Sequence, residues 1–146
     1  MTDLPMNRIT LLTLGVRDIA RSRGFYGSLG WKEAGAQDGV VFYMLDGMIM
    51  GLFGLEPLAA DQGRPGAELG FGAVTLAQNY GDATEVELAY ERALAAGATG
   101  LRPPTETHWG GYTAYFADPD GHVWELAYNP HWPLDEKGRV AARDDI

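Results

Sequence analysis

The sequence predicts an α+β fold made of two βαβββ modules, whose strands form a curved mixed or antiparallel sheet around a cleft. A hairpin pattern with an aspartate-glycine turn occurs twice, at residues 42–52 and 115–126. An expected strand and then an expected helix precede each hairpin in the same order. Such a sheet buries one face under its helix, so we expect a small-molecule site on the other face.

The first module spans about residues 7–55. Asp18 is typical of a helix N-cap and Gly30 of a helix end. Asp46-Gly47 favours the tight turn of a hairpin. The expected elements are a strand at 9–16, a helix at 18–29, a strand at 31–36 and the hairpin at 42–52.

The second module spans about residues 69–130 and repeats this order. Asp82, with Glu85 three residues later, forms a capping-box pattern, and Gly97 ends the helix. We expect a linker at about 56–68, rich in Pro, Gly and Ala, and an extended tail at 131–146. The whole of 1–146 is interpreted as a single domain. The expected elements are a strand at 71–78, the helix, a strand at 99–102 and the hairpin at 115–126.

The charge and composition of the chain argue against two classes of binding partner, nucleic acids and membranes. The chain has 146 residues, a formal charge of −9 and no cysteine. Its acidic field would repel phosphate backbones and anionic membranes, so we expect neither nucleic acid nor a membrane as partner. No apolar run approaches the roughly 18 residues of a membrane span. The first ten residues lack the pattern of a secretion signal, so we expect a cytoplasmic location.

Three segments carry a family resemblance. They are residues 16–31, the Ala-Ala-Gly-Ala at 95–98, and YFADPDGHVWEL at 115–126. On these motifs the chain resembles the vicinal oxygen chelate superfamily, which includes glyoxalases, bleomycin-resistance proteins and extradiol dioxygenases. The resemblance covers about residues 7–130 and implies the same paired βαβββ architecture.

The resemblance also implies where a metal would bind. Metal-dependent members hold a divalent ion with His, Glu or Gln side chains from the first and last strands of each module. These positions fall on Leu11, Gly51, Val74 (or Thr75 with a one-residue shift) and Glu125. Only Glu125 is a competent ligand, so we expect no cofactor and disfavour a divalent metal. This puts glyoxalase and dioxygenase chemistry in doubt, because both depend on a metal.

Two residues are candidates for proton transfer. Glu125 alternates with Trp124 and Leu126, so it should face the cleft, where an apolar environment would raise its pKa. Glu125 is therefore the candidate general acid or base; the alternative is a structural carboxylate that an arginine or a backbone donor satisfies. His108, in the loop before the second hairpin, could relay a proton or simply be solvated.

A larger set of residues is expected to contact a ligand. Trp109 and Tyr112 flank Gly110-Gly111 and could form an aromatic lid, or they could close an edge of the core. The expected ligand-contacting residues are Leu11, Thr13, Met50, Val74, Trp109, Tyr112 and Glu125.

The leading functional hypothesis is a binding protein for a small apolar or aromatic metabolite or drug, held in the cleft without the family metal. The acidic charge would suit a cationic ligand. One alternative is a metal-independent isomerase or lyase that uses Glu125 as general base. Another is a metal-dependent enzyme of the glyoxalase or dioxygenase type. The resemblance also implies a homodimer, because family members often assemble their clefts across chains.

Overall fold

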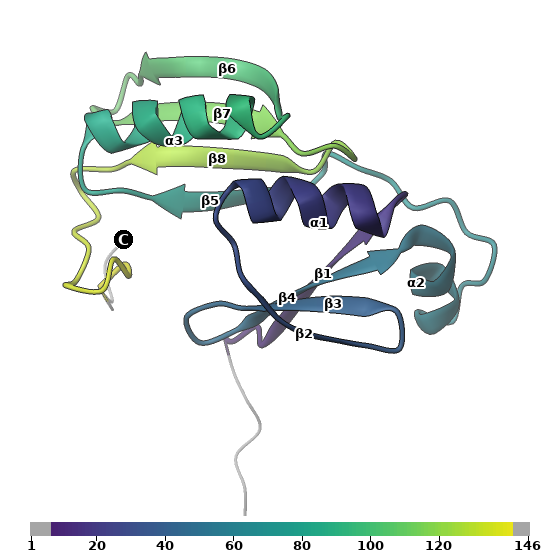
Figure 1. Cartoon of the computed structure of the whole chain (residues 1–146). Coiled ribbons are helices and arrows are strands. Elements are labelled where there is room, and N and C mark those ends of the chain that lie inside the picture. The colour runs from purple at the N-terminus through teal and green to yellow at the C-terminus, as the bar shows by residue number, and fades with distance from the viewer. Residues whose placement is uncertain (1–6, 142–146) are drawn as a thin grey trace, which may run out of the picture. The chain divides into compact units, whose positions relative to one another are not determined.

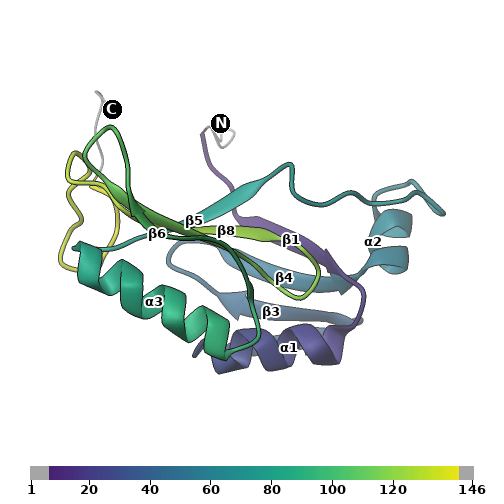
Figure 2. The ribbon, with the colours of Figure 1, turned by 90° about the horizontal axis from the view of Figure 1, so that it is seen from above.

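The computed structural model describes residues 7–141, which form two compact units divided between Leu69 and Gly70. Each unit contains one four-stranded sheet with a helix along it (Figure 1, Figure 2). The order strand, helix and three further strands occurs in both units. The α+β fold with two repeated modules is therefore confirmed.

The first unit has the strand order β1-β4-β3-β2. β1 is parallel to β4 and the other two pairs are antiparallel, so the sheet is mixed. Its elements are β1 (Leu11–Val16), α1 (Ile19–Ser28), β2 (Glu33–Gln37), β3 (Val40–Met44), β4 (Ile49–Gly54) and α2 (Leu55–Asp61).

The second unit has the equivalent order β5-β8-β7-β6, with β5 parallel to β8. The β7–β8 and β6–β7 pairs are antiparallel. Its elements are β5 (Thr75–Asn79), α3 (Ala83–Ala95), β6 (Thr99–Glu106), β7 (Tyr112–Ala117) and β8 (Val123–Tyr128).

Both long helices begin at the predicted caps. The Asp18 carboxylate accepts a hydrogen bond from the Arg21 amide at 3.1 Å. The Asp82 carboxylate accepts from the Glu85 amide at 2.9 Å, and the Glu85 carboxylate accepts from the Gly81 amide at 3.1 Å. The capping box is thus present, although the Glu85 carboxylate binds the amide of Gly81, the residue before the N-cap, and not the amide of Asp82 itself. Such caps each stabilise a helix by about 1 kcal/mol.

The long helices α1 and α3 each cover one face of their sheet, and the core lies there. The short helix α2 packs against the other face of the first sheet, next to Gly15. In the first unit, alternate strand residues point toward α1 and are at most 6% exposed; they are Leu14, Val16, Val41, Tyr43, Met50 and Leu52. In the second unit, α3 packs on β6, β7 and β8. The buried residues there include Val86, Ala93, Ala114, Phe116, Trp124 and Leu126. The opposite face of each sheet carries the other half of the strand residues.

The structure adds detail to three expectations for the regions outside the core strands. The linker at 56–68 contains most of α2, because Pro57 lies in the first turn of that helix, where proline is tolerated. The strand expected at 99–102 continues to Glu106 through Pro103-Pro104, which is possible because β6 is an edge strand. The tail to residue 141 is not simply extended, since Leu134 pairs with Val140; residues 142–146 lie outside the described part.

Other strand bounds shift by a few residues. The strand expected at 9–16 begins at Leu11, and the one expected at 31–36 runs from Glu33 to Gln37. The strand expected at 71–78 is Thr75–Asn79. Within residues 7–141, no helix has the length and apolar character to cross a bilayer.

Candidate functional site

Glu125 lies on the face of the second sheet that α3 does not cover, here called the open face. Its neighbours Trp124 and Leu126 are buried on the α3 side, at 5% and 1% exposure. Because side chains alternate along a strand, Glu125 points the other way, as the sequence predicts, and is partly buried. In the sheet it lies between Ala77 of β5 and Tyr115 of β7.

The Glu125 carboxylate has a hydrogen-bond partner on this face. The Tyr115 hydroxyl donates to Glu125 Oε2 at 3.0 Å. Arg102 of β6 is opposite Tyr115 on its other side, so Arg102, Tyr115, Glu125 and Ala77 form one row across all four strands. We call Arg102, Tyr115 and Glu125 the polar row.

The surroundings raise the pKa of Tyr115. Burial is the largest cause, followed by the hydrogen bond to Glu125 and the negative charge of that carboxylate. The positive charge of Arg102 opposes this increase. The phenol is therefore held protonated and keeps its donor role toward Glu125. The pair offers a ligand one aromatic ring and one carboxylate with remaining acceptor capacity.

The equivalent position in the first unit has no functional side chain. Gly51 lies between Thr13 of β1 and Phe42 of β3, as Glu125 lies between Ala77 and Tyr115. An added Cβ at Gly51 would stand 3.2 Å from Val40 Cγ1, so even a methyl group would be tight there. Thr13 shares this face, and Leu11, two residues earlier on the same strand, is 48% exposed.

The register corrects two expected ligand contacts. Met50 is 0% exposed and points toward α1, because it is adjacent to Gly51 and must face the opposite way. The expectation that Met50 contacts a ligand on the open face is therefore wrong. Thr75 pairs with Val123 as Leu11 pairs with Ile49, so Thr75, and not Val74, is the counterpart of Leu11. Val74 precedes β5.

The described residues do not fit the metal-dependent ligand set. Among residues 7–141, no group of three or more His, Cys, Asp or Glu side chains is arranged to hold a metal ion. At the family positions, Leu11 and Gly51 have no donor side chain, and Thr75 has only a neutral hydroxyl. Among these four positions of the described chain, Glu125 is the one with a carboxylate side chain.

Tyr112 lies on the side of the sheet opposite to Glu125. It is the first residue of β7, three positions before Tyr115, and an odd separation along a strand places two side chains on opposite faces. Its hydroxyl donates to Glu87 Oε1 of α3 at 2.8 Å, and this hydrogen bond is the main cause of the raised pKa of Tyr112. Tyr112 therefore does not share a face with Glu125, and a role of its ring in a lid over a ligand stays a prediction.

The loop 107–111 holds the other two predicted residues. Thr107 organises it: its amide donates to the Gly111 carbonyl at 2.9 Å, and its hydroxyl accepts from the Gly111 amide at 2.9 Å. Trp109 folds back onto Gly111, where an added Cβ would overlap its ring, and remains 39% exposed. His108 is exposed in this loop. The loop joins β7 at Tyr112, about 10 Å along the strand from the Tyr115–Glu125 pair.

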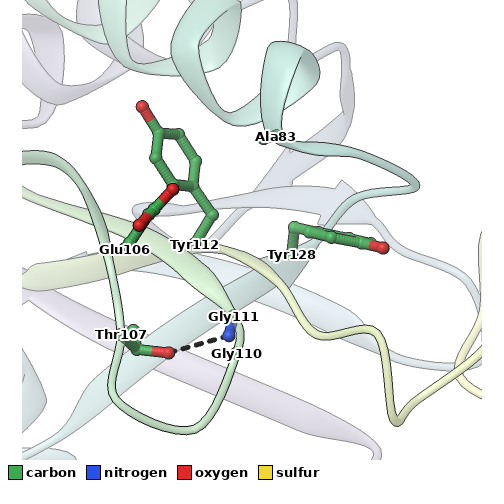
Figure 3. A pocket seen from close by; sticks show the side chains of 7 residues that line it. All are labelled: Ala83, Glu106, Thr107, Gly110, Gly111, Tyr112 and Tyr128. Carbon is green, nitrogen blue, oxygen red and sulfur yellow. Dashed lines mark hydrogen bonds between the residues drawn. The ribbon is translucent and has the colours of Figure 1, made fainter.

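A hollow of about 350 Å³ opens at this end of the second unit, on the α3 side (Figure 3). Figure 3 shows the Tyr112 ring directed toward α3 and the Tyr128 ring directed to the side. Sequence reasoning missed Glu106, Thr107 and Tyr128 as members of one site. The residues that line the hollow are Ala83, Glu106, Thr107, Gly110, Gly111, Tyr112 and Tyr128.

Comparison with known proteins agrees with this architecture. The model of the Glyoxalase/Bleomycin resistance protein/Dioxygenase superfamily matches residues 8–126. A glyoxalase-related enzyme from Fulvimarina pelagi is 36% identical, with a TM-score of 0.86 over 94% of this chain and 99% of that chain. A glyoxalase/bleomycin resistance protein/dioxygenase from Nocardioides is 26% identical, with a TM-score of 0.73 over 86% and 85% of the two chains.

A lactoylglutathione lyase from Agrobacterium tumefaciens shares the fold at 21% identity and a TM-score of 0.67, over 90% of this chain and 100% of that chain. No curated protein matches the chain. The match over most of the sequence and the 36% identical structure agree with each other. The chain belongs to the glyoxalase/bleomycin resistance protein/dioxygenase superfamily.

Proposed function

We propose that the protein binds a small apolar or aromatic ligand on the open face of the second sheet, without the family metal. The Tyr115–Glu125 pair is the polar contact that orients the ligand. The observation that carries this proposal is the 3.0 Å hydrogen bond from the Tyr115 hydroxyl to Glu125 Oε2. It leaves the carboxylate in a defined position with further acceptor capacity toward a ligand.

The residues around the pair favour a ligand that is mostly apolar. Ala77, beside Glu125 in the sheet, is exposed and has only a methyl side chain, so it leaves space in front of the carboxylate. Val123, two residues before Glu125 on β8, also belongs to this face and is partly exposed. A cationic group on the ligand would suit both Glu125 and the formal charge of −9.

We favour binding over base catalysis because the Glu125 carboxylate already accepts a hydrogen bond from the Tyr115 hydroxyl. A metal-independent isomerase or lyase remains the second candidate function, since Tyr115 would be a proton donor next to the base. In that case Glu125→Gln would abolish turnover while leaving the folded structure unchanged. A binding protein would instead show a loss of affinity and no turnover to abolish.

The test compares three ligands of similar shape and different charge. Protein treated with EDTA and dialysed is titrated with tryptamine, indole and indole-3-acetate by isothermal calorimetry. We expect tryptamine to bind most tightly, and we expect Glu125→Gln and Tyr115→Phe each to weaken it by about tenfold, the effect of losing one charge-assisted hydrogen bond. Glu91→Gln, which removes the same charge from α3, is the matched control.

Two results would overturn the proposal. One is an equal affinity for tryptamine in Glu125→Gln and Glu91→Gln. The other is about one tightly held divalent ion per chain before EDTA treatment, with ligand binding lost on its removal, which would favour the metal-dependent enzyme. We also propose a homodimer, and sedimentation equilibrium of the untagged chain would test it.

A further inference from the structure

The hollow on the α3 side is built on a second row of side chains that crosses three strands. Tyr112 of β7 is opposite Glu106 of β6 on one side and Tyr128 of β8 on the other. Directly paired residues point to the same face, with their Cβ atoms about 5 Å apart. Two aromatic rings and one carboxylate therefore line the same hollow (Figure 3).

The shape of the hollow is set by the fold. Ala83, the first residue of α3, has only a methyl group to place over the tyrosines. The opposite wall is the loop 107–111. It is held in place by hydrogen bonds from the Gly110 and Gly111 amides to Thr107 and from the Thr107 amide to the Gly111 carbonyl. Gly110 has a φ of +94°, which suits glycine. A ligand would meet a largely formed surface, which reduces the ordering cost of binding.

The charge around the hollow is negative. Glu106 lines it, and Glu87, one helical turn after Ala83, accepts the Tyr112 hydroxyl. Both carboxylates contribute to the raised pKa of Tyr112, which places their charges close to that ring. At the start of α3, the Glu85 amide is already bonded to Asp82, so this helix end adds two further carboxylates rather than a free anion site.

We propose that this hollow is a second ligand site, which takes a small organic monocation such as an alkyl or quaternary ammonium group. Aromatic faces attract such cations, and carboxylates next to the rings add to that attraction. An anion would face Glu106 and Glu87, and a neutral apolar ligand would gain nothing from them. The site is on the opposite side of the sheet from Glu125, so it stands independently of the proposed function.

The test uses choline and its neutral isostere, 3,3-dimethyl-1-butanol. Nitrogen-15-labelled protein is titrated with each at low ionic strength, and amide shifts of Ala83, Gly110 and Gly111 are followed by NMR. We expect saturable shifts with choline and at least about tenfold weaker binding of the neutral isostere, the ratio that a cation–π contact and a carboxylate supply. Raising the salt concentration should weaken choline binding.

Four variants test whether choline binds in this hollow. Glu106→Gln should weaken choline binding by about fivefold, as the loss of one neighbouring charge predicts. Tyr128→Leu should weaken it by a similar factor. Glu91→Gln, on the same helix as Ala83 but outside the hollow, and Glu125→Gln, on the open face, should leave it unchanged.

The proposal is overturned if choline and the isostere bind equally, or if Glu106→Gln and Glu91→Gln behave alike. Choline-induced shifts around Glu125 that vanish in Glu125→Gln would assign the cation to the open face instead. Glu106 is exposed, so its variant tests the site even if Tyr128→Leu fails to fold.

Discussion

The Tyr115–Glu125 hydrogen bond should appear as a measurable coupling in stability. A hydrogen bond to a charged acceptor contributes roughly 1.5–3 kcal/mol. Both side chains are only partly buried, so water competes for them and we expect a coupling of about 1 kcal/mol in a double-mutant cycle. The cycle consists of Tyr115→Phe, Glu125→Gln and the double variant, each unfolded with urea at pH 7.

The same pair makes a prediction about pH. The pKa of Tyr115 is raised in the folded state, so folded protein holds the phenol proton more tightly than unfolded protein does. This contribution to stability is fully present below the usual tyrosine pKa of about 10. It is lost as the pH rises through the higher folded value. Glu125→Gln should lower the midpoint of the Tyr115 titration, and Arg102→Met should raise it, because Arg102 opposes the shift.

The assay for this part is ultraviolet absorbance of tyrosinate, with Tyr115→Phe subtracted to isolate one phenol. Two results would refute the reasoning. Additive single variants, with a coupling below about 0.3 kcal/mol, would mean that the hydrogen bond does not hold in solution. An unchanged Tyr115 midpoint in Glu125→Gln would mean that the carboxylate does not lie next to the hydroxyl.

Four further variants test the placement of other residues. Met50→Ala should cost about 2–5 kcal/mol because its side chain is fully buried, whereas Leu11→Ala should cost under about 1 kcal/mol; equal losses in urea unfolding would contradict the register. Asp82→Ala should cost about 1 kcal/mol through the lost cap, and no change in stability would argue against that cap. Gly111→Ala should displace the Trp109 ring and shift its fluorescence to longer wavelength, while an unchanged spectrum would show that the ring does not pack there.

The helix ends could be predicted because their signals are local. Asp18 and Asp82 each bind an amide three residues later, and that spacing is visible in the sequence. The glycine ends are equally local: Gly30 and Gly97 have φ values of +93° and +107°, which glycine adopts without strain. No knowledge of the rest of the chain is needed for either feature.

The sheet face to which a strand residue points could be predicted only where the strand pairing could be predicted. The repeat aligns Gly51 with Glu125, and the sheets confirm that equivalence. Met50 is next to Gly51 and cannot share its face, yet a soft apolar residue in an apolar strand gives no local sign of its direction. The same problem affects Tyr112, because its glycine-rich neighbours suggest a loop whereas pairing with Tyr128 places it in a strand.

Tyr115 could have been found from the second hairpin. Its turn holds Asp118 and Gly121, so counting outward from the turn pairs Ala117 with Val123 and then Tyr115 with Glu125. Arg102 could not have been found in this way. It belongs to β6, whose pairing with β7 shifts register on both sides of Arg102, and such irregularities have no reliable signal in a single sequence.

The two modules share a fold but differ in one row of side chains, and this difference is the reason for proposing a site in the second unit. Thr13, Gly51 and Phe42 occupy the row in the first unit; Ala77, Glu125 and Tyr115 occupy it in the second. Tyr115 differs from Phe42 by the hydroxyl that donates to Glu125. In the first unit Gly51 stands in place of the glutamate, so a hydroxyl at position 42 would have no carboxylate to bind there. The aromatic ring is thus retained in both units, while the charge and its donor occur together in one.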